Sequence, residues 1–139
     1  MKIRFLGVGA AFTTPAYYQS NMLITAPSGR HLLLDCGADA RFSLSEQLAA
    51  IGAELTAETC HRLVDAVFIS HLHSDHIGGL ENLFYRVFKQ DTATKTRLFV
   101  PIRLVEILQR RLADFPNILA EGGKNFWDEF QLIPVSERF

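Results

Sequence analysis

The sequence predicts an α/β fold with one mixed β-sheet and helices on one face. Short apolar runs of strand length alternate with helical stripes along most of the chain. Two early runs flank a turn-rich segment, which predicts a hairpin, and a helical pattern separates the second run from the next strand. The composition, 48% hydrophobic and 21% charged, is typical of a globular protein, and 139 residues suffice for one domain.

The first half of the chain contains three predicted strands. A short strand is expected at 2–6, and a hairpin of strands at 21–26 and 31–35 surrounds the turn-forming residues 27–30. The run Leu32-Leu33-Leu34 does not alternate with polar residues. Both faces of this strand are therefore expected to meet apolar groups.

A helix is predicted next, because apolar positions recur on one helical face: Ala40, Leu44, Leu48 and Ile51. Ser43 and Glu46 have the spacing of a capping box, and Gly52 is interpreted as the end of this helix. Thr56 is expected to cap a short turn after it. His31 and His61 have no ligand-like spacing, so both are interpreted as surface histidines.

The second half continues the alternation. A strand at 65–70 is expected to be buried on both faces, and a strand at 97–100 ends at Pro101. Between them lies a core-facing helical stripe: Leu80, Leu83, Phe84, Val87 and Phe88. A further helix is predicted from the apolar positions Leu104, Ile107, Leu108 and Leu112. Three arginines near its other face are interpreted as a solvated face: Arg103, Arg110 and Arg111. This helix is expected to end at Phe115-Pro116, and Gly122-Gly123 indicates a loop after it. A last strand-like apolar segment occupies 126–135.

Charge and composition exclude several classes of protein. A formal net charge of −1 gives no electrostatic reason to expect nucleic-acid binding. No apolar run approaches the roughly 18 residues of a membrane span, and the opening residues do not continue into a signal peptide. Two cysteines form neither a metal-type pair nor a disulfide framework. A cytoplasmic protein is the expectation.

The most informative stretch is His71-Leu72-His73-Ser74-Asp75-His76, which follows the apolar run 66–69. It gathers three imidazoles and a carboxylate within six residues at the end of a predicted strand. Neutral imidazole nitrogen and carboxylate oxygen are the ligands that zinc and similar divalent metals prefer. In α/β sheets, sites usually lie outside the carboxyl ends of strands. The stretch therefore predicts a metal site.

This His-x-His-x-Asp-His run, continued by Gly78-Gly79-Leu80, resembles the signature of the metallo-β-lactamase superfamily. The segment 1–9, the strand at 21–26 and the run 31–37 are similar to the opening hairpins of the family, with the flavour of its RNase Z-like and phosphodiesterase-like branch. The resemblance implies half of an αββα sandwich. It also implies that His71 and His73 bind one metal ion and that Asp75 and His76 bind a second.

The function that the resemblance implies is hydrolysis of a phosphodiester or ester by metal-bound hydroxide, with a small-molecule substrate. Asp75 is expected in addition to orient the attacking water or accept its proton. Zn²⁺ is the expected metal, with Mn²⁺ or Fe as alternatives. The long loop after the first strand, in which Gly7 and Gly9 lack the third glycine of a phosphate loop, lies near the active site in that family. Tyr17 and Tyr18 either contact substrate there or are exposed aromatics.

Asp35 ends a buried strand, so its carboxylate must be hydrogen-bonded or paired. One interpretation places Asp35, together with Ser70, behind the metal ligands, where a carboxylate orients a ligand histidine through its distal N–H. The other makes Asp35 a loop-capping carboxylate. The resemblance favours the first, because it sets this strand beside the metal loop.

The family completes its site with further histidines and an aspartate, but no histidine follows His76 in this sequence. Residues 1–139 thus look like a single truncated domain, the first half of the family's. Metal is then expected to bind weakly or not at all unless other groups complete the site. An open apolar sheet face predicts a homodimer. The alternative function is a catalytically inactive half-domain that acts as a dimer or interaction module.

Overall fold

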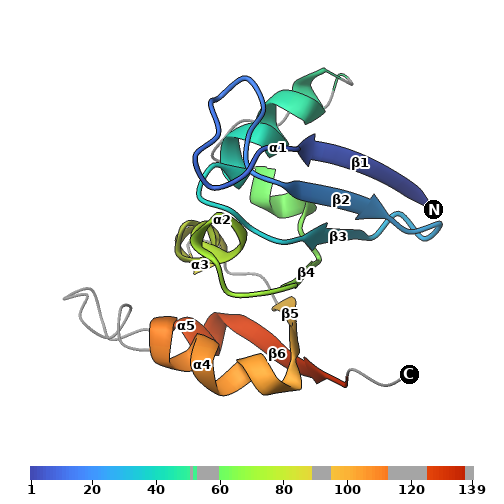
Figure 1. Cartoon of the computed structure of the whole chain (residues 1–139). Helices are drawn as coiled ribbons and strands as arrows, with labels where there is room; N and C mark the ends of the chain where they lie inside the picture. Colours follow the sequence, from blue (N-terminus) through green and yellow to red (C-terminus); the bar gives the residue numbers. More distant parts are fainter. Residues whose placement is uncertain (51, 53–59, 89–94, 113–124, 137–139) are drawn as a thin grey trace.

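The computed structural model describes residues 1–50, 52, 60–88, 95–112 and 125–136 (Figure 1). Within these residues, six strands form one mixed sheet in chain order: β1 (Lys2–Gly7), β2 (Asn21–Thr25), β3 (His31–Leu34), β4 (Ala66–Phe68), β5 (Thr96–Pro101) and β6 (Phe130–Val135). The first three strands pair antiparallel, and β3 to β6 pair parallel. The predicted α/β class with a mixed sheet is confirmed.

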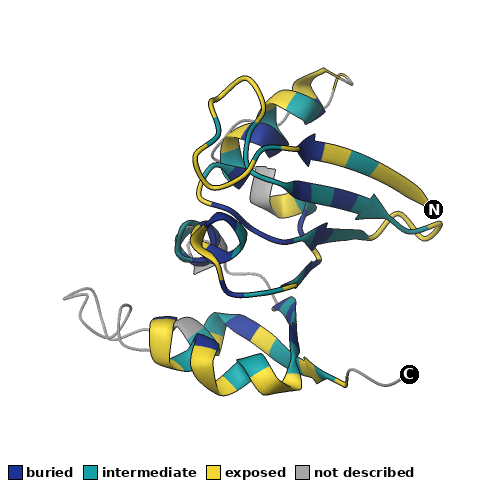
Figure 2. Ribbon diagram, viewed as in Figure 1, coloured by how far each residue is buried: buried dark blue, intermediate teal, exposed yellow. Residues whose placement is uncertain are grey.

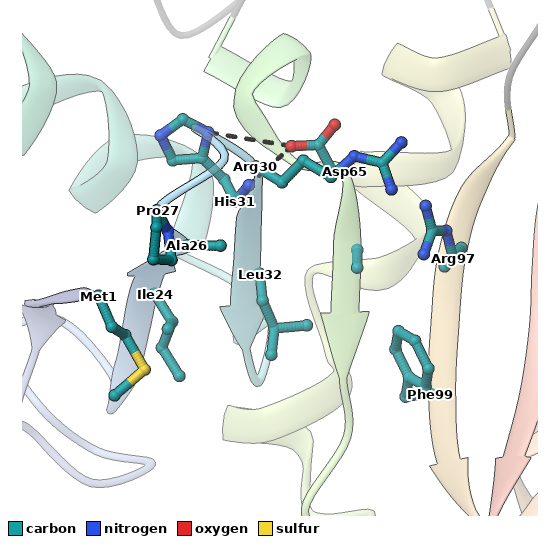
Figure 3. A pocket seen from close by; sticks show the side chains of 11 residues that line it. Met1, Ile24, Ala26, Pro27, Arg30, His31, Leu32, Asp65, Arg97 and Phe99 are labelled. Atoms are coloured by element: carbon teal, nitrogen blue, oxygen red, sulfur yellow. Dashed lines mark hydrogen bonds and ion pairs between the residues drawn. The ribbon is translucent and has the colours of Figure 1, made fainter.

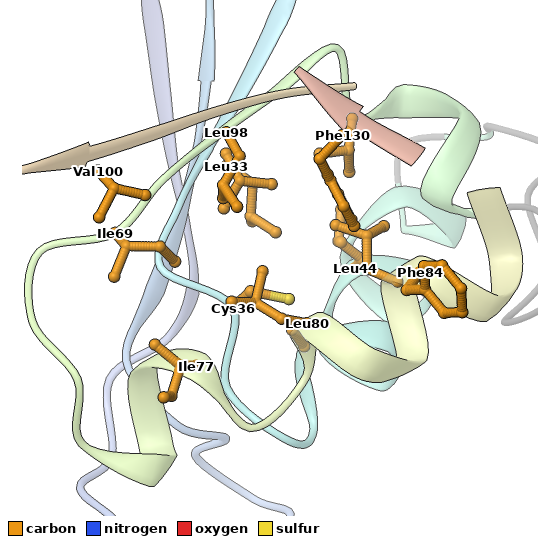
Figure 4. Close-up of a cluster of buried hydrophobic side chains, with 14 of the residues drawn as sticks. Leu33, Cys36, Leu44, Ile69, Ile77, Leu80, Phe84, Leu98, Val100 and Phe130 are labelled. Atoms are coloured by element: carbon orange, nitrogen blue, oxygen red, sulfur yellow. The ribbon is translucent and has the colours of Figure 1, made fainter. Parts of the chain in front are cut away.

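The helices gather over one face of this sheet (Figure 1). They are α1 (Ala40–Ala49), a 3-10 turn η1 (Cys60–Leu63), α2 (Ser74–Ile77), α3 (Leu80–Phe88), α4 (Ile102–Leu112) and α5 (Phe126–Glu129). Leu44 of α1, Phe84 of α3 and Leu108 of α4 belong to a single buried cluster. The same cluster includes the central strand residues Leu33 and Leu98, and Figure 4 shows these side chains between strands and helices. Burial of this layer is the main stabilising contribution.

The register of the sheet aligns two rows of side chains that point to opposite faces. The core row includes Leu23, Leu33, Val67 and Leu98, which are paired neighbours on successive strands and are all buried. The opposite row crosses all six strands in register: Phe5, Met22, Leu34, Phe68, Phe99 and Ile133. We call this second set the open row. Its members are half-buried or exposed, and Phe5 is 62% exposed. Figure 2 shows exposed and intermediate stretches along β1.

The open row shows why β3 has no alternation in its sequence. Leu33 is fully buried under the helices, whereas Leu32 and Leu34 lie half-buried on the other face. The expectation that both faces are buried is therefore wrong for β3, and in β4 it holds at Ala66 and Val67 but not at the half-buried Phe68. Towards one end of these strands the open face contains a hollow of about 280 Å³, whose lining includes Ile24, Leu32 and Phe99 (Figure 3).

Two local predictions are corrected by the structure. Ser43 does not cap α1; the helix begins earlier, after Asp39, and Ser43 is buried inside it. There its hydroxyl lies 3.1 Å from the main-chain oxygen of Ala40 and 3.4 Å from Oδ1 of Asn21, so packing against β2 decides its place. The first four residues of 126–135 form α5 because the side chain of Asn125 accepts a hydrogen bond from the amide of Trp127 at 2.9 Å.

Gly52 follows α1 in a turn with a φ of 75°, as a glycine near a helix end often does. The roles predicted for Ile51, Thr56, Phe115-Pro116 and Gly122-Gly123 lie outside the described residues. Among the described helices, none is both long enough and apolar enough to cross a bilayer.

Candidate metal centre

The predicted ligands lie on the loop that leaves β4 and on the first turns of α2. This loop packs against the segment that leaves β3: the amide of Cys36 donates to the main-chain oxygen of His76, and the amide of Gly79 donates to that of Cys36, both at 2.8 Å. A Cβ at Gly79 would overlap the carbonyl oxygen of Gly37, so a glycine is needed for this close approach. The carboxyl ends of β3 and β4 thus meet at one place.

The four predicted ligands form two pairs of donor atoms. Nε2 of His71 lies 3.1 Å from Nδ1 of His73, and Oδ2 of Asp75 lies 3.3 Å from Nε2 of His76. The two pairs are adjacent, since the ring centroids of His71 and His76 are 3.9 Å apart. With zinc–nitrogen bonds of about 2.0–2.1 Å, two ligands of a tetrahedral site lie about 3.3–3.4 Å apart. Each pair therefore has the spacing of two ligands that share one zinc ion.

A buried carboxylate supports both pairs from behind. Asp35 is 6% exposed, and its Oδ1 accepts the amide of Ser70 at 2.7 Å. Its Oδ2 accepts the Ser70 hydroxyl at 2.7 Å and lies 2.8 Å from Nδ1 of His76. Asp35 has a φ of 61°, a left-handed conformation that aspartate tolerates better than most residues. The backbone is thus turned so that one carboxylate meets three donors.

These contacts assign the ring protons of two histidines. Ser70 gives its hydroxyl proton to Asp35, so its oxygen accepts Nδ1–H of His71, which lies 3.0 Å away. Asp35 accepts Nδ1–H of His76 directly. In the neutral form of each ring the Nε2 lone pair then faces the paired ligand. The Nε2 lone pair of His76 faces the carboxylate of Asp75, and the two repel each other unless a proton or a cation lies between them. A metal ion bound by both groups would remove this repulsion.

The donor set is incomplete within the described residues. No three histidine, cysteine, aspartate or glutamate side chains in that part of the chain converge on one point. Two ligands per metal fall short of the three that a catalytic zinc site normally takes from protein. The residues present therefore fit two half-sites, each of which needs further ligands from elsewhere.

Arg111 is exposed, as expected for a solvated helix face, but it also makes a contact that the sequence does not indicate. Its Nη1 donates to the carbonyl oxygen of Leu72 at 2.6 Å. Leu72 lies between His71 and His73, so the arginine reaches the metal loop itself. Helical periodicity places Arg111 on the rim of the α4 stripe but carries no information about a loop 39 residues earlier in the chain.

The remaining candidates lie away from the ligands. His31 is half-buried, and its Nδ1 lies 3.9 Å from Oδ2 of Asp65, the residue before β4. The side chain of His61 lies outside the described residues. Tyr17 is 62% exposed. Tyr18 donates its hydroxyl to Glu46 at 2.5 Å, and this hydrogen bond raises the pKa of Tyr18 to about 12. Substrate contact by either tyrosine stays a prediction.

Known structures share this architecture. The chain is similar to YhfI, a metallo-β-lactamase fold protein from Bacillus subtilis, with 19% identity and a TM-score of 0.64 over 96% of this chain and 44% of that one. It is also similar to the short form of human tRNase Z, with 26% identity and a TM-score of 0.57 over 81% of this chain and 39% of that one. The fold is that of the metallo-β-lactamases.

Sequence comparison is more specific. The chain is 32% identical to the Anti-Pycsar protein Apyc1 of Paenibacillus xerothermodurans, over 99% of this chain and 50% of the relative. It is 33% identical to the protein of that name from Bacillus phage BSP38, over 99% of this chain and 47% of the relative. The chain thus spans about half the length of these relatives. The family model for Anti-Pycsar protein Apyc1 matches residues 1–139, and the chain belongs to this family.

Proposed function

We propose that this chain provides the first half of the active site of a binuclear metal-dependent phosphodiesterase. The observation that carries the proposal is the spacing of the two donor pairs, 3.1 Å between the ring nitrogens of His71 and His73 and 3.3 Å between Asp75 and His76. Zn²⁺ is the metal proposed, with Mn²⁺ or Fe as alternatives. We propose that the chain is related to the RNase Z-like and phosphodiesterase-like branch of this fold.

The chain's own residues prepare this site. Asp35 holds the proton of His76 on Nδ1, and through Ser70 it holds that of His71 on Nδ1 as well. Both Nε2 lone pairs are thereby kept free for metal ions, without a change of tautomer on binding. Because Asp35 is buried and bonded on both oxygens, the two rings have little rotational freedom.

The chemistry that bound metal ions supply is a nucleophilic water at neutral pH and a clamp on the attacking and leaving oxygens. Asp75 is 9% exposed, and one of its oxygens faces His76. Its carboxylate is proposed to orient the attacking water and to accept a proton from it. Removing this group should therefore lower kcat more than it raises KM.

The proposed substrate is a small phosphodiester. Two structural neighbours, tRNase Z and a diphosphatase of the PhnP family, are named for reactions at phosphorus. A net charge of −1 gives no electrostatic reason to favour a long polyanion. The substrates to test are small phosphodiesters, bis(p-nitrophenyl) phosphate and a 3′,5′-cyclic nucleotide, with a carboxylic ester for comparison.

The open row is proposed to be a contact surface. The open row is apolar on every strand, and monomers rarely leave a contiguous apolar surface of this extent in water. A second copy is the partner we propose, since a two-fold contact pairs one flat face with itself. Light scattering should give twice the chain mass at micromolar concentration, and Phe99→Glu should give the single mass. A stable wild-type monomer would exclude the dimer.

The test of activity uses metal content and hydrolysis together. Wild type should retain metal after dialysis and hydrolyse at least one phosphodiester, and the double variant His71→Ala with His73→Ala should lose both. His31→Ala is the matched control, because this histidine lies near Asp65 at the other end of the strands. A metal-free wild type no more active than the double variant would favour the alternative, an inactive half-domain that acts as an interaction module.

A further inference from the structure

Arg111 makes a contact that the proposed metal site does not by itself explain. Its Nη1 donates to the carbonyl oxygen of Leu72 at 2.6 Å, a bond between α4 and the loop after β4. A hydrogen bond from a guanidinium is charge-assisted and stronger than a neutral one. The accepting carbonyl belongs to the residue between the two ligands of the first donor pair.

Arg111 differs from the neighbouring arginine in its partner, although both side chains are exposed. Arg110 pairs with Glu106 one turn earlier on α4, and both of these side chains are more than three-quarters exposed. Arg111 lies one position further round the helix, next to Leu112, which is 6% exposed and buried with Leu108 in the core. The buried stripe thus fixes the rotation of α4, and this rotation turns Arg111 towards the loop.

Leu72 is held from two sides as a result. Its side chain is 9% exposed and belongs to the core cluster, and its carbonyl oxygen accepts Arg111. The next residue is His73, whose own carbonyl oxygen accepts the amides of His76 and Ile77 at 3.0 and 3.1 Å. A bond that fixes the Leu72 carbonyl therefore fixes the backbone from which both histidines of the first pair project.

We propose that Arg111 is a positioning residue for the donor pair of His71 and His73. It acts through the backbone of Leu72, so that the spacing of this pair depends on the position of α4 against the core. The inference rests on the proposed function, because a fixed spacing of the pair matters only if the pair binds metal. Metal ligands must be held within about 0.5 Å of their productive positions, which a loop free on one side does not ensure.

The test compares Arg111→Met with Arg110→Met in the full chain. Methionine keeps the apolar stem and the helix propensity of arginine but removes the donor. Co²⁺ titration followed by visible absorption reports the ligand field, and amide exchange of His76 and Ile77 reports the loop without metal. Arg111→Met should weaken Co²⁺ binding about tenfold, alter the absorption band, and speed exchange about tenfold. Arg110→Met should match wild type in both measurements.

The outcomes separate the two proposals. If wild type binds Co²⁺ and Arg111→Met behaves like Arg110→Met, the positioning role is wrong while the metal site stands. If wild type binds no Co²⁺, the proposed function is wrong, and amide exchange alone decides whether Arg111 holds the loop. Circular dichroism checks folding. Should Arg111→Met unfold, Arg111→Gln carries the same prediction, since the glutamine side chain is uncharged and too short to reach the carbonyl oxygen of Leu72.

Discussion

Replacing Asp35 with asparagine tests how the site is organised. Asparagine keeps the size of the side chain and tolerates the φ of 61° found at this position. It replaces one carboxylate oxygen by an NH₂ group and removes the charge. All three neighbours of the carboxylate are donors: the Ser70 amide, the Ser70 hydroxyl and Nδ1 of His76. An NH₂ group must therefore face at least one donor.

The magnitude follows from that conflict. The amide oxygen is best placed at Oδ2, where it accepts both Ser70 Oγ–H and His76 Nδ1–H, and the NH₂ group then faces the Ser70 amide. One unsatisfied buried donor costs about 1–3 kcal/mol of unfolding free energy. Weaker support of the ligand rings should lower metal affinity by about 10–100-fold, as for other groups that orient ligand histidines.

The assay is competition for Zn²⁺ with a chromophoric chelator, together with urea unfolding of the metal-free protein. Asp65→Asn is the matched control, because Asp65 also lies near a histidine, but at the opposite end of the strands (Figure 3). Asp65→Asn should leave Zn²⁺ affinity within about twofold of wild type. Equal affinities for wild type and Asp35→Asn would refute the assigned tautomers and the role of Asp35.

Three further predictions address the fold. Leu98→Ala should lower the unfolding free energy in urea by about 2–5 kcal/mol, because this side chain is fully buried. Gly79→Ala should lower both the unfolding free energy and the Zn²⁺ affinity, because its Cβ would overlap the carbonyl oxygen of Gly37. Gly29→Ala lies in open space at a φ of 82° and should lower only the unfolding free energy, by about 1–2 kcal/mol. The raised pKa of Tyr18 contributes stability that is present below the ordinary tyrosine pKa of 10.0 and is lost as pH rises towards 12. Wild type should therefore lose more stability than Tyr18→Phe between those pH values, and parallel losses would contradict this.

The sequence predicted what depends on local pattern. The strand predicted at 97–100, with its end at Pro101, corresponds to β5, which spans Thr96–Pro101. The metal motif was recognisable because four ligands lie within six residues on one loop. The position of Asp35 beside that loop followed from the resemblance, since parallel neighbours bring their carboxyl ends to one edge.

Other features depend on contacts between distant segments. The bond from Arg111 to Leu72 joins residues 39 apart, and periodicity gives no sign of it. The spacing of Ser43 and Glu46 predicts a capping box, yet Ser43 lies inside α1 and contacts Asn21 of β2. That contact joins two segments far apart in the sequence. The hydroxyl relay from His71 through Ser70 depends on where one proton lies, which only the assembled network determines.

The central claim is that the two donor pairs hold two metal ions, and anomalous diffraction at the zinc edge tests it most directly. Crystals soaked in Zn²⁺ should give one peak between Nε2 of His71 and Nδ1 of His73 and a second between Oδ2 of Asp75 and Nε2 of His76. His71→Ala should abolish the first peak. Zinc bound only elsewhere, for example between His31 and Asp65, would contradict the account.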